Sequence, residues 1–481
     1  MDESVAITQK VAATAGDPRA IFETQRTAFL RADAPSLAER RADLTRLRDA
    51  IEKSARPLAA AISGDFGNRS RYETEIGEIV PVLAAIRHAR RHLRGWMRPK
   101  RVPVPLELLP GRARILYQPL GVVGIISPWN YPFQLAVAPL VAALSAGNRV
   151  MLKPSELAPR TSEFLAEFLG GSFPTDQVAT VLGGPDVGQA FARLPFDHLL
   201  YTGSTAVGRR VMQAAAENLT PVTLELGGKS PCILAEDAIL PSAVESIVYG
   251  KLLNAGQTCI APDYVLLPER SLEEFIKLTA DTIAKFYPAL AGNPDYSAII
   301  AERHYHRLAH YVAEATASGA RVVEINPGRE PLSAETRKLP PTLVINPSND
   351  LAIMREEIFG PLLPVTTYRR IEDAIDYVNG RPRPLALYYF GSGRGQRDEV
   401  MRRTLSGGVS INTTLFHFAA ENLPFGGVGP SGIGAYHGEF GFQTFSHRRA
   451  VFLQSRINGA WLLYPPFGRL TDLVLRLLSR R

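Results

Sequence analysis

The stretch 122–226 decides the fold, because five apolar runs in it alternate with helical patterns. The runs are VVGIIS (122–127), RVMLK (149–153), VATVL (178–182), HLLYT (198–202) and PVTLEL (221–226). The helical patterns between them begin near Phe133, Ala158, Asp186 and Thr205. Five strands separated by four helices are typical of a parallel, doubly wound α/β sheet. Such sheets bind ligands at the carboxyl ends of their strands, where the loops 127–132, 153–156 and 203–208 fall.

On either side of this stretch the pattern predicts further parts of the fold. Residues 1–100 are largely helical and are expected to join 120–226 in a first domain, to which 431–444 returns. A second α/β series predicts a second domain over 227–430. Between the helices and the first strand, 101–119 predicts a β-hairpin turning at Pro110-Gly111, and 445–454 predicts another strand.

Composition excludes several classes of protein. The chain has 481 residues, of which 46% are hydrophobic and 21% charged, the balance of a globular protein of two or three domains. A net charge of +7 invites a nucleic-acid interpretation, but the arginines are scattered and no nucleic-acid motif accompanies them. Two cysteines cannot form a disulfide framework. No apolar run reaches the roughly 18 residues of a membrane span, and the first ten residues do not form a signal peptide, so we expect a cytoplasmic protein.

The sequence does not match the common motifs for nucleotide-binding loops and metal sites. Residues 427–432, GVGPSG, match G-x-G-x-x-G but follow no clear strand and contain proline. The GKS at 228–230 lacks the first glycine of a phosphate-binding loop, since position 223 is Thr223. His306 and His310 share a helix face without an HExxH pattern, so no metal site is expected.

A more specific set of residues combines a thiol, a carboxylate and an amide. Glu225 ends the fifth strand, and Cys259 follows it by 34 positions in the sequence NAGQTC. Asn130 follows the first strand in SPWNYP, and EEIFGP (356–361) supplies another acidic and aromatic loop. We expect Asn130, Glu225 and Cys259 to meet where the two α/β domains join. Taken alone, Cys259 fits a buried core thiol as well as a nucleophile, whereas Cys232, inside PCIL, fits the core.

With these motifs the chain resembles the NAD(P)-dependent aldehyde dehydrogenase superfamily. Six motifs occur in the order of that family, and the resemblance extends over nearly all the sequence. They are PWNYP, KPSE, TGSTAVG, ELGGKSP, GQTC and EEIFGP. The tail PFGGVGPSGIGAYHGEFGFQTFSH resembles the class 3 branch, and together with INTTLFH and DFGNRSRYETE it is most similar to coniferyl aldehyde dehydrogenases. The resemblance implies a Rossmann-type cofactor domain, a second α/β catalytic domain and a small β element for oligomerisation, made of 101–119 and 445–454.

The resemblance also implies the roles of the site residues. Cys259 would attack the aldehyde carbon and form a hemithioacetal and then a thioester, Asn130 would stabilise the negative oxygen, and Glu225 would activate the hydrolytic water. The expected cofactor-binding residues are Ser127, Trp129, Lys153, Glu156, Gly203, Ser204, Glu357 and Phe359. Because Glu156 opposes a 2′-phosphate, NAD is expected, with NADP as the alternative since class 3 relatives often accept both. The substrate implied is an aldehyde that is aromatic, such as coniferaldehyde, or otherwise large and hydrophobic.

Alternatives remain at this point. A long-chain fatty aldehyde is the second substrate class, and acyl transfer to coenzyme A or reduction of an acyl phosphate are rival reactions on the same fold. A basic scaffold that binds nucleic acid is the non-enzymatic rival. The tail 468–481 predicts an amphipathic helix, with apolar residues on one face at Leu470, Leu473, Val474, Leu477 and Leu478. We expect it to pack on its own subunit or on a homodimer partner; a gate over the substrate funnel and contact with a membrane surface are the lesser alternatives.

Overall fold

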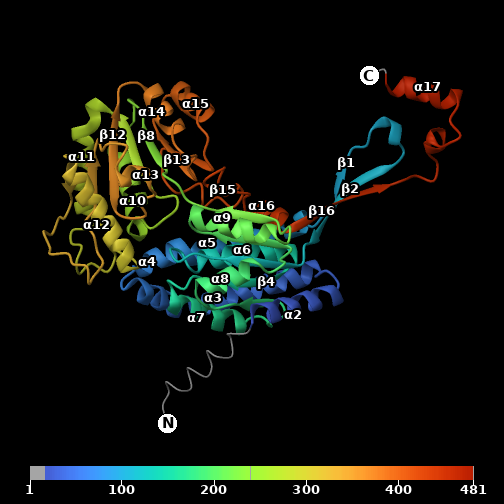
Figure 1. The fold of residues 1–481 in the computed structure, drawn as a ribbon, viewed down its shortest axis with the longest axis horizontal. Helices are drawn as coiled ribbons and strands as arrows, with labels where there is room; N and C mark the ends of the chain where they lie inside the picture. Colours follow the sequence, from blue (N-terminus) through green and yellow to red (C-terminus); the bar gives the residue numbers. More distant parts are fainter. Residues whose placement is uncertain (1–16, 239, 480–481) are drawn as a thin grey trace, which may run out of the picture.

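The computed structural model describes residues 17–238 and 240–479. The sequence-based statement that the first ten residues form no signal peptide falls outside these residues, as do the last two residues of the predicted terminal helix. The described chain forms two α/β lobes and an arm that projects from them (Figure 1). No helix in the described ranges is both long and apolar enough to cross a membrane.

Helices from the N-terminal part of the chain cover the lower lobe. Ser36 and Glu39 form a capping box at the start of the longest one, and Gly67, at φ 78°, ends it in a left-handed conformation that favours glycine. Further on, one turn of π-helix interrupts the rod that runs from Arg71 to Trp96. The elements are α2 (Pro18–Arg31), α3 (Leu37–Phe66), α4 (Arg71–Thr74), η1 (Glu75–Ile79) and α5 (Val80–Trp96).

The lower lobe contains a six-stranded sheet in the order β15-β7-β6-β3-β4-β5. Its five parallel strands are the five apolar runs of the sequence: β3 (Val122–Ile126), β4 (Arg149–Lys153), β5 (Val178–Thr180), β6 (His198–Thr202) and β7 (Val222–Glu225). The four predicted helices between them are also confirmed: α6 (Gln134–Ala146), α7 (Pro159–Gly170), α8 (Pro185–Ala192) and α9 (Thr205–Ala216). The sixth strand, β15 (Gly432–Ile433), runs antiparallel to β7 and brings the 431–444 segment to this lobe.

The upper lobe contains a seven-stranded sheet in the order β10-β11-β12-β9-β8-β13-β14, parallel except for β10. Its strands are β8 (Pro231–Leu234), β9 (Tyr264–Pro268), β10 (Arg321–Glu324), β11 (Thr342–Ile345), β12 (Leu362–Tyr368), β13 (Ala386–Phe390) and β14 (Gly408–Ile411). The helical segments of the second half are α10 (Leu240–Leu252), η3 (Leu253–Gly256), η4 (Glu269–Ser271), α11 (Leu272–Phe286), α12 (Glu302–Ala317), α13 (Ala352–Arg355), α14 (Ile371–Asn379), α15 (Arg394–Arg403) and α16 (Gly438–Thr444).

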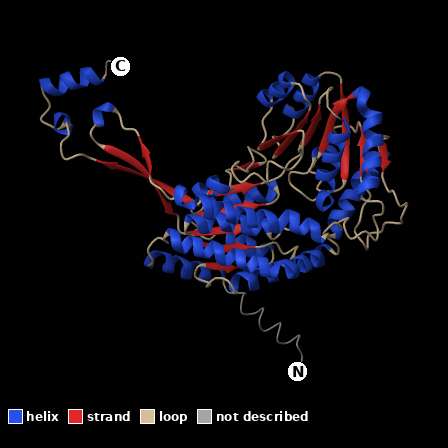
Figure 2. Ribbon diagram, turned by 180° about the vertical axis from the view of Figure 1, so that it is seen from behind, coloured by secondary structure: helices blue, strands red, loops and turns tan. Residues whose placement is uncertain are grey.

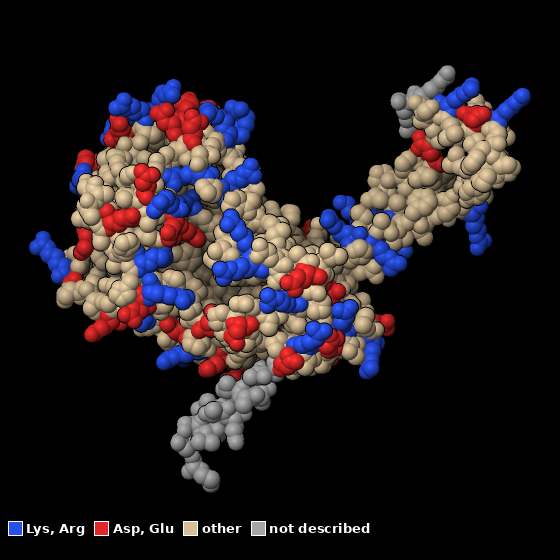
Figure 3. Space-filling view, in the orientation of Figure 1, with Lys and Arg blue, Asp and Glu red and all other residues tan. Residues whose placement is uncertain are grey.

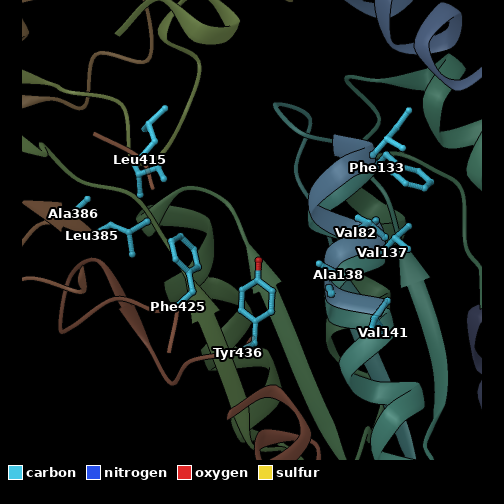
Figure 4. Close-up of a cluster of buried hydrophobic side chains, with 14 of the residues drawn as sticks. Val82, Phe133, Val137, Ala138, Val141, Leu385, Ala386, Leu415, Phe425 and Tyr436 are labelled. Carbon is cyan, nitrogen blue, oxygen red and sulfur yellow. The ribbon is translucent and has the colours of Figure 1, made fainter. Parts of the chain in front are cut away.

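The two lobes share one apolar core. Buried side chains of α5, α6 and the loop before it face buried side chains of the second half of the chain (Figure 4). The first group includes Val82, Phe133, Val137, Ala138 and Val141, and the second includes Leu385, Ala386, Leu415, Phe425 and Tyr436. Burying a large apolar side chain contributes roughly 1.5–3 kcal/mol, so this shared core holds the lobes in a defined relation.

The arm is a three-stranded antiparallel sheet, β1-β2-β16, which Figure 2 shows from behind. Its strands are β1 (Lys100–Val102), β2 (Arg112–Pro119) and β16 (Ser446–Leu453). The predicted hairpin is present, and residues 108–111 form a turn in which the Gly111 N–H donates to the carbonyl oxygen of Leu108 over 2.8 Å. The whole connection is longer than this turn, because nine residues, 103–111, join β1 to β2 and include the short helix η2 (Leu106–Leu108). Pro103 and Pro105 cannot donate ladder hydrogen bonds, which accounts for the early end of β1.

The tail continues from the arm as η5 (Ala460–Leu463) and α17 (Arg469–Leu478), and Figure 1 places α17 at the far end, away from both lobes. Within one copy of the chain α17 therefore does not pack on either lobe, and packing on a partner subunit, the other branch of the expectation, stays a prediction. Lys and Arg are interspersed with Asp and Glu on the face shown in Figure 3, as the scattered arginines of the sequence predict.

Candidate functional site

Cys259 lies on an irregular loop between α10 and β9. Asn254 and Ala255 have φ of 54° and 50°, values that non-glycine residues rarely adopt. Gly256 follows at φ 77°, and a Cβ there would lie 2.3 Å from the carbonyl oxygen of Gly360, so the loop requires glycine at this position. Strained backbone of this kind often marks functional sites. The loop holds Cys259, which is only partly buried, at the junction of two cavities.

The first cavity, which we call the apolar cavity, has no charged residue in its lining. It encloses about 750 Å³ with its open mouth. Its wall combines aliphatic and aromatic side chains with a few neutral polar ones: Ile76, Gly77, Pro81, Tyr131, Gln134, Leu135, Tyr249, Leu253, Thr258, Cys259, Ile260, Leu415, Phe416, Phe418, Ala419 and Phe425. Such a cavity suits an apolar molecule of substantial size.

The second cavity, which we call the polar cavity, encloses about 760 Å³ on the other side of Cys259. It lies at the carboxyl ends of β3, β6 and β7, where doubly wound sheets bind ligands. Its lining carries titratable groups: Pro128, Trp129, Asn130, Leu135, Thr202, Gly203, Ser204, Glu225, Leu226, Gly227, Cys259, His304, Arg307, Glu357 and Phe359. The two cavities share only Cys259 and Leu135 among these lining residues. The structure thus brings Asn130, Glu225 and Cys259 to one cavity.

Two carboxyl groups of the polar cavity, the buried Glu225 and the partly buried Glu357, have three oxygens without a hydrogen-bond partner in the described chain. Glu225 is 2% exposed, and neither of its carboxylate oxygens has a hydrogen-bond partner in the described chain. Burial raises the pKa of Glu225 well above its ordinary value. Burial also raises the pKa of Glu357 to about 8, with Asp263 adding to the rise and Lys229 opposing it. Both groups are therefore better proton acceptors than surface carboxylates.

The same burial acts on the thiol. Burial first, and then the negative charges of Glu357 and Glu225, raise the pKa of Cys259 far above that of a free cysteine. In the protein alone the sulfur is therefore held mainly as the neutral thiol. A positive charge in the polar cavity would favour the nucleophilic thiolate.

Asn130 is oriented by hydrogen bonds on both sides. Its side-chain nitrogen donates to the carbonyl oxygen of Gln257 over 3.1 Å, and its backbone carbonyl oxygen accepts from the Asn254 side chain over 3.0 Å. One of the two N–H bonds of the amide is thus engaged, and the other is available to an oxygen atom in the cavity. Thr258, next to Cys259, is held by the Tyr131 hydroxyl at 2.8 Å.

A buried ionic network, which the sequence reasoning missed, supports these loops from the helical part. Arg69 and Glu78 form an ion pair of 2.6 Å with both side chains fully buried, and Arg69 also donates to the carbonyl oxygen of Asn130 over 3.1 Å. Glu73 accepts from the backbone N–H of Asn254 over 3.0 Å. Residues far apart in the sequence therefore fix the Asn130 and Cys259 loops. Arg69 and Glu73 lie inside the DFGNRSRYETE motif, and this motif was the only feature of the sequence that could have pointed to the network.

Two further residues of the polar cavity were also missed. His304 stacks on Trp129, with ring centroids 5.2 Å apart, and Trp129 meets Phe359 edge to face at 5.5 Å. Arg307, one turn after His304 on α12, donates to the carbonyl oxygen of Ile358 over 2.8 Å. The sequence reasoning considered His306, on another side of this helix, where it is exposed and 3.3 Å from Glu302.

The remaining predicted residues occupy different positions around the polar cavity. Gly203 and Ser204 line it at the start of α9, and Ser204 caps that helix through the N–H of Val207. Ser127 and Lys153 are buried beside it at the ends of β3 and β4, without appearing in its lining. Lys153 lies 3.5 Å from Glu156, which is partly exposed.

These residues fit a dinucleotide. The helix start offers backbone N–H groups to a phosphate, and the partly buried Glu357 has an oxygen without a hydrogen-bond partner in the described chain. A Cβ on Gly227 would lie 2.3 Å from that oxygen, so glycine leaves the Glu357 carboxylate its place.

Lys229 and the 427–432 segment have structural roles. The Lys229 ammonium binds the Asp263 carboxylate and donates to the carbonyl oxygens of Ile353 and Glu356, at 2.7 and 2.9 Å. It thereby holds the EEIFGP loop against β9. The GVGPSG segment forms a turn that leads into β15 beside β7, which agrees with its rejection as a dinucleotide loop.

The chain is similar to known aldehyde dehydrogenases over most of its length. The model of the aldehyde dehydrogenase family matches residues 2–451. The probable coniferyl aldehyde dehydrogenase of Pseudomonas aeruginosa is 52% identical over 464 residues, which are 96% of each chain. Aldehyde dehydrogenase family 3 member A2 of Rattus norvegicus is 40% identical over 88% of this chain and 86% of its own. The solved structure of the P. syringae indole-3-acetaldehyde dehydrogenase AldA with NAD+ and IAA has a TM-score of 0.82 at 26% identity, covering 92% of this chain and 90% of its own.

Proposed function

Because the chain belongs to the aldehyde dehydrogenase family, we propose that it oxidises an aromatic aldehyde of the coniferaldehyde type to the carboxylic acid. The observation that carries the proposal is the position of Cys259 between an uncharged, aromatic-walled cavity and a polar cavity that fits a dinucleotide. An aldehyde in the first cavity can place its carbonyl carbon at the sulfur while its ring stays in apolar surroundings.

In this mechanism Cys259 is the nucleophile. The thiol first loses its proton to water in the cavity. The thiolate sulfur then adds to the carbonyl carbon as the second C=O bond pair moves to the oxygen, which accepts the free N–H of the Asn130 amide. NAD+, when bound in the polar cavity, supplies the hydride acceptor. Loss of the hydride leaves a thioester on Cys259. The fixed orientation of Asn130 matters because a donor that is already aimed at the oxygen needs no reorganisation.

Glu225 is the base of the second half-reaction. Water attacks the thioester carbon while one of its protons passes to Glu225, and the sulfur then leaves with the electron pair of the C–S bond. The raised pKa of Glu225 supports this role, since a carboxyl group with an ordinary pKa is a weak base. This base also supports hydrolysis over acyl transfer to coenzyme A or to phosphate.

The polar cavity would hold the cofactor through residues assigned from the sequence. Trp129, Gly203, Ser204, Glu357 and Phe359 would contact it directly. Ser127, Lys153 and Glu156 would lie at its adenosine end, where the carboxylate of Glu156 would repel a 2′-phosphate and favour NAD over NADP. Replacing Glu156 with Gln should therefore lower the KM for NADP more than the KM for NAD.

The arm would join two copies of the chain into a homodimer. Its end exposes large apolar side chains that a soluble monomer rarely displays together: Trp461, Tyr464, Phe467, Leu470, Leu473 and Leu477. A partner subunit would cover them, and a cytoplasmic location would keep Cys259 reduced. Sedimentation equilibrium of the wild type and of Leu473→Asp tests this part, with a shift toward monomer expected in the variant.

A panel of aldehydes tests the substrate. Initial rates of NADH and NADPH formation should be highest in kcat/KM for cinnamic and benzylic aldehydes with NAD. A preference for C6–C16 aliphatic aldehydes would instead establish the long-chain fatty aldehyde activity. Formation of an acyl-coenzyme A product, followed by mass spectrometry, would contradict the hydrolytic reaction.

A further inference from the structure

The direction of the Asn130 amide depends on two loops that come from different lobes. Asn130 follows β3 of the lower lobe. Gln257, whose carbonyl oxygen accepts one N–H of the Asn130 side chain over 3.1 Å, lies two residues before Cys259 in the loop that leads to β9 of the upper lobe. Both the backbone of Asn130 and the carbonyl group of Gln257 must therefore be fixed if the second N–H is to point in one direction. One side chain, that of Asn254, binds both.

Asn254 bridges the two loops through its side-chain amide. The nitrogen donates to the backbone carbonyl oxygen of Asn130 over 3.0 Å and to that of Gln257 over 3.2 Å. Together with the bond from Asn130 to Gln257, these contacts form a closed ring of three hydrogen bonds. Asn254 is 0% exposed, so bulk water does not compete for its two N–H bonds. A movement of this amide would therefore shift both groups that direct the Asn130 side chain.

The orientation of the Asn254 amide follows from the atoms around it. Both groups that it binds are carbonyl oxygens, which accept hydrogen bonds, so only the nitrogen end of the amide can face them. Its own oxygen is buried without a hydrogen-bond partner in the described chain, which is unfavourable. The side chain is thus placed to hold the two carbonyl groups, although this leaves its oxygen unpaired.

The backbone of Asn254 is held separately from its side chain. Its φ is 54°, a left-handed conformation that asparagine adopts more readily than most residues. Its N–H donates to Glu73 over 3.0 Å, and its carbonyl oxygen accepts the side chain of Gln257 over 3.0 Å. Glu73 in turn accepts the hydroxyl of Ser297 over 2.5 Å. Because these contacts do not involve the side chain of Asn254, a variant can lose the bridge and keep the loop.

Arg69 holds the same carbonyl oxygen of Asn130 from the helical part of the lower lobe. Its Nη1 donates to that oxygen over 3.1 Å while it pairs with Glu78. The other oxygen of Glu78 accepts the backbone N–H groups of Phe133 and Gln134, over 2.8 and 3.0 Å. The backbone of this loop is thus fixed at Asn130 and again at the start of α6. What remains to be set is the direction of the Asn130 side chain.

We propose that Asn254 is a positioning residue, which directs the free N–H of the Asn130 amide at the substrate oxygen that becomes negative. The proposal rests on the proposed function, in which Asn130 donates to that oxygen. Asn254 belongs to the lining of neither cavity, so it acts through Asn130 and not on the substrate or the cofactor. Its contribution is geometric, because a displacement of about 1 Å at a reacting site can cost roughly 10²-fold in rate.

Asn254→Gly tests the bridge alone. Glycine adopts a φ of 54° without strain and keeps the N–H that binds Glu73, so only the side-chain contacts are lost. The rate constant of the NADH burst, measured by stopped flow, should fall roughly 10–100-fold. The KM for NAD+ should stay within about twofold of wild type, since the polar cavity is unchanged. Thermal melting followed by circular dichroism checks that the variant is folded.

A double-mutant cycle separates positioning from a general structural role. Asn130→Ala alone should lower the burst rate constant roughly 10²–10³-fold, the usual cost of removing one oxyanion donor. Adding Asn254→Gly should lower it by less than about threefold more, because no amide remains to be directed. A residue that only stabilises the fold would lower the rate constant by the same factor in both backgrounds.

Asn346→Gly is the matched control. Asn346 also has a left-handed backbone, with φ 46°, and its side chain accepts the N–H of Thr367 over 2.9 Å, but it follows β11, outside both cavities. The same substitution there should leave the burst rate constant within about twofold of wild type.

Arg69→Lys keeps the test decisive should Asn254→Gly fold poorly. Lysine retains a positive charge beside Glu78 but lacks the forked guanidinium that also reaches the Asn130 carbonyl oxygen. This variant should slow the burst in the wild-type background and not in Asn130→Ala.

Three results would overturn the proposal. A wild-type burst rate constant in folded Asn254→Gly, or in Arg69→Lys where Asn254→Gly does not fold, would show that the bridge is not needed. Effects that multiply in the double variant would make Asn254 a purely structural residue, and an equal loss in Asn346→Gly would trace the effect to backbone flexibility. A normal burst in Asn130→Ala would instead refute the oxyanion donor itself, which is a failure of the proposed function.

Discussion

The two cavities that meet at Cys259 differ in what they do to charge. The apolar cavity has no charged residue in its wall, whereas the polar cavity holds Glu225, Glu357 and Arg307. Both enclose similar volumes, so size does not distinguish them. Under the proposed function this difference separates two tasks: the apolar cavity would select a substrate by burial of apolar surface, and the polar cavity would hold the cofactor and the group that accepts a proton. Cys259 would take part in both, because of the two lining residues that the described cavities share, Cys259 and Leu135, it is the one with a nucleophilic atom.

The strongest test of this difference between the cavities is to remove the sulfur atom of Cys259. Cys259→Ala should lower kcat for aldehyde oxidation by at least roughly 10⁴-fold, because no other nucleophile lines both cavities. Cys232→Ala is the control, since Cys232 is fully buried within β8 and should affect stability only. Aldehyde-dependent NADH formation measures both. Retained activity in Cys259→Ala would refute the assignment.

A second variant removes the proposed base, Glu225, which lines the polar cavity and not the apolar cavity. Glu225→Gln should reduce steady-state turnover roughly 10²–10⁴-fold while an NADH burst of one per site persists. The physical reason is that the amide cannot accept the proton of water, whereas addition of sulfur and loss of hydride do not require it. Rapid-mixing experiments check this prediction, and a vanished burst would assign Glu225 to the first half-reaction instead.

The pH dependence of cofactor binding tests the charge of the polar cavity. With a pKa of about 8, Glu357 is neutral below this pH and anionic above it. A carboxylate accepts the hydroxyl groups of a ribose and attracts the cationic ring of NAD+, so binding favours the ionised form. Affinity for NAD+ should therefore rise roughly tenfold from about pH 6.5 to about pH 8 and then level off. Calorimetric titration measures it, and Glu357→Gln should flatten the profile. A wild-type affinity that falls over this range would contradict the assignment.

The smallest expected effect concerns the apolar cavity. Phe416 lines it but is 61% exposed, so Phe416→Ala should leave folding largely intact. The KM for a cinnamic aldehyde should rise about three- to tenfold through lost apolar contact. The KM for NAD+ should not change, because Phe416 does not line the polar cavity. Equal changes in both constants would show that the cavities are not independent.

Much of the candidate site could be predicted from the sequence, because its residues directly follow strands that local hydrophobic patterns reveal. Asn130 and Glu225 follow apolar strands whose periodicity is visible in the sequence, and parallel strands end at one edge of their sheet. The position of the EEIFGP loop and the structural role of Lys229 could not be derived in this way. Both depend on contacts between β9 and a loop almost a hundred residues later.

The buried ionic network around Arg69 shows more clearly what could not be predicted from the sequence. Arg69, Glu73 and Glu78 belong to a charged helical stretch, and such residues are usually solvated. Only the packing of α4, η1 and α5 against the loops of Asn130 and Cys259 shows that they are buried and paired. Likewise, helical periodicity places His304 and His306 on one helix but cannot tell which side faces a cavity.

The sequence by itself determined the α/β architecture, the order of the strands along the chain and the residue types that can carry the chemistry, because these depend on local hydrophobic patterns and short motifs. Tertiary structure alone decided the two cavities and the buried Arg69–Glu78 pair. It also placed α17, whose amphipathic pattern was visible in the sequence, at the end of the arm. Burial and electrostatic environment arise from contacts between distant segments, and these contacts exist only in the folded chain.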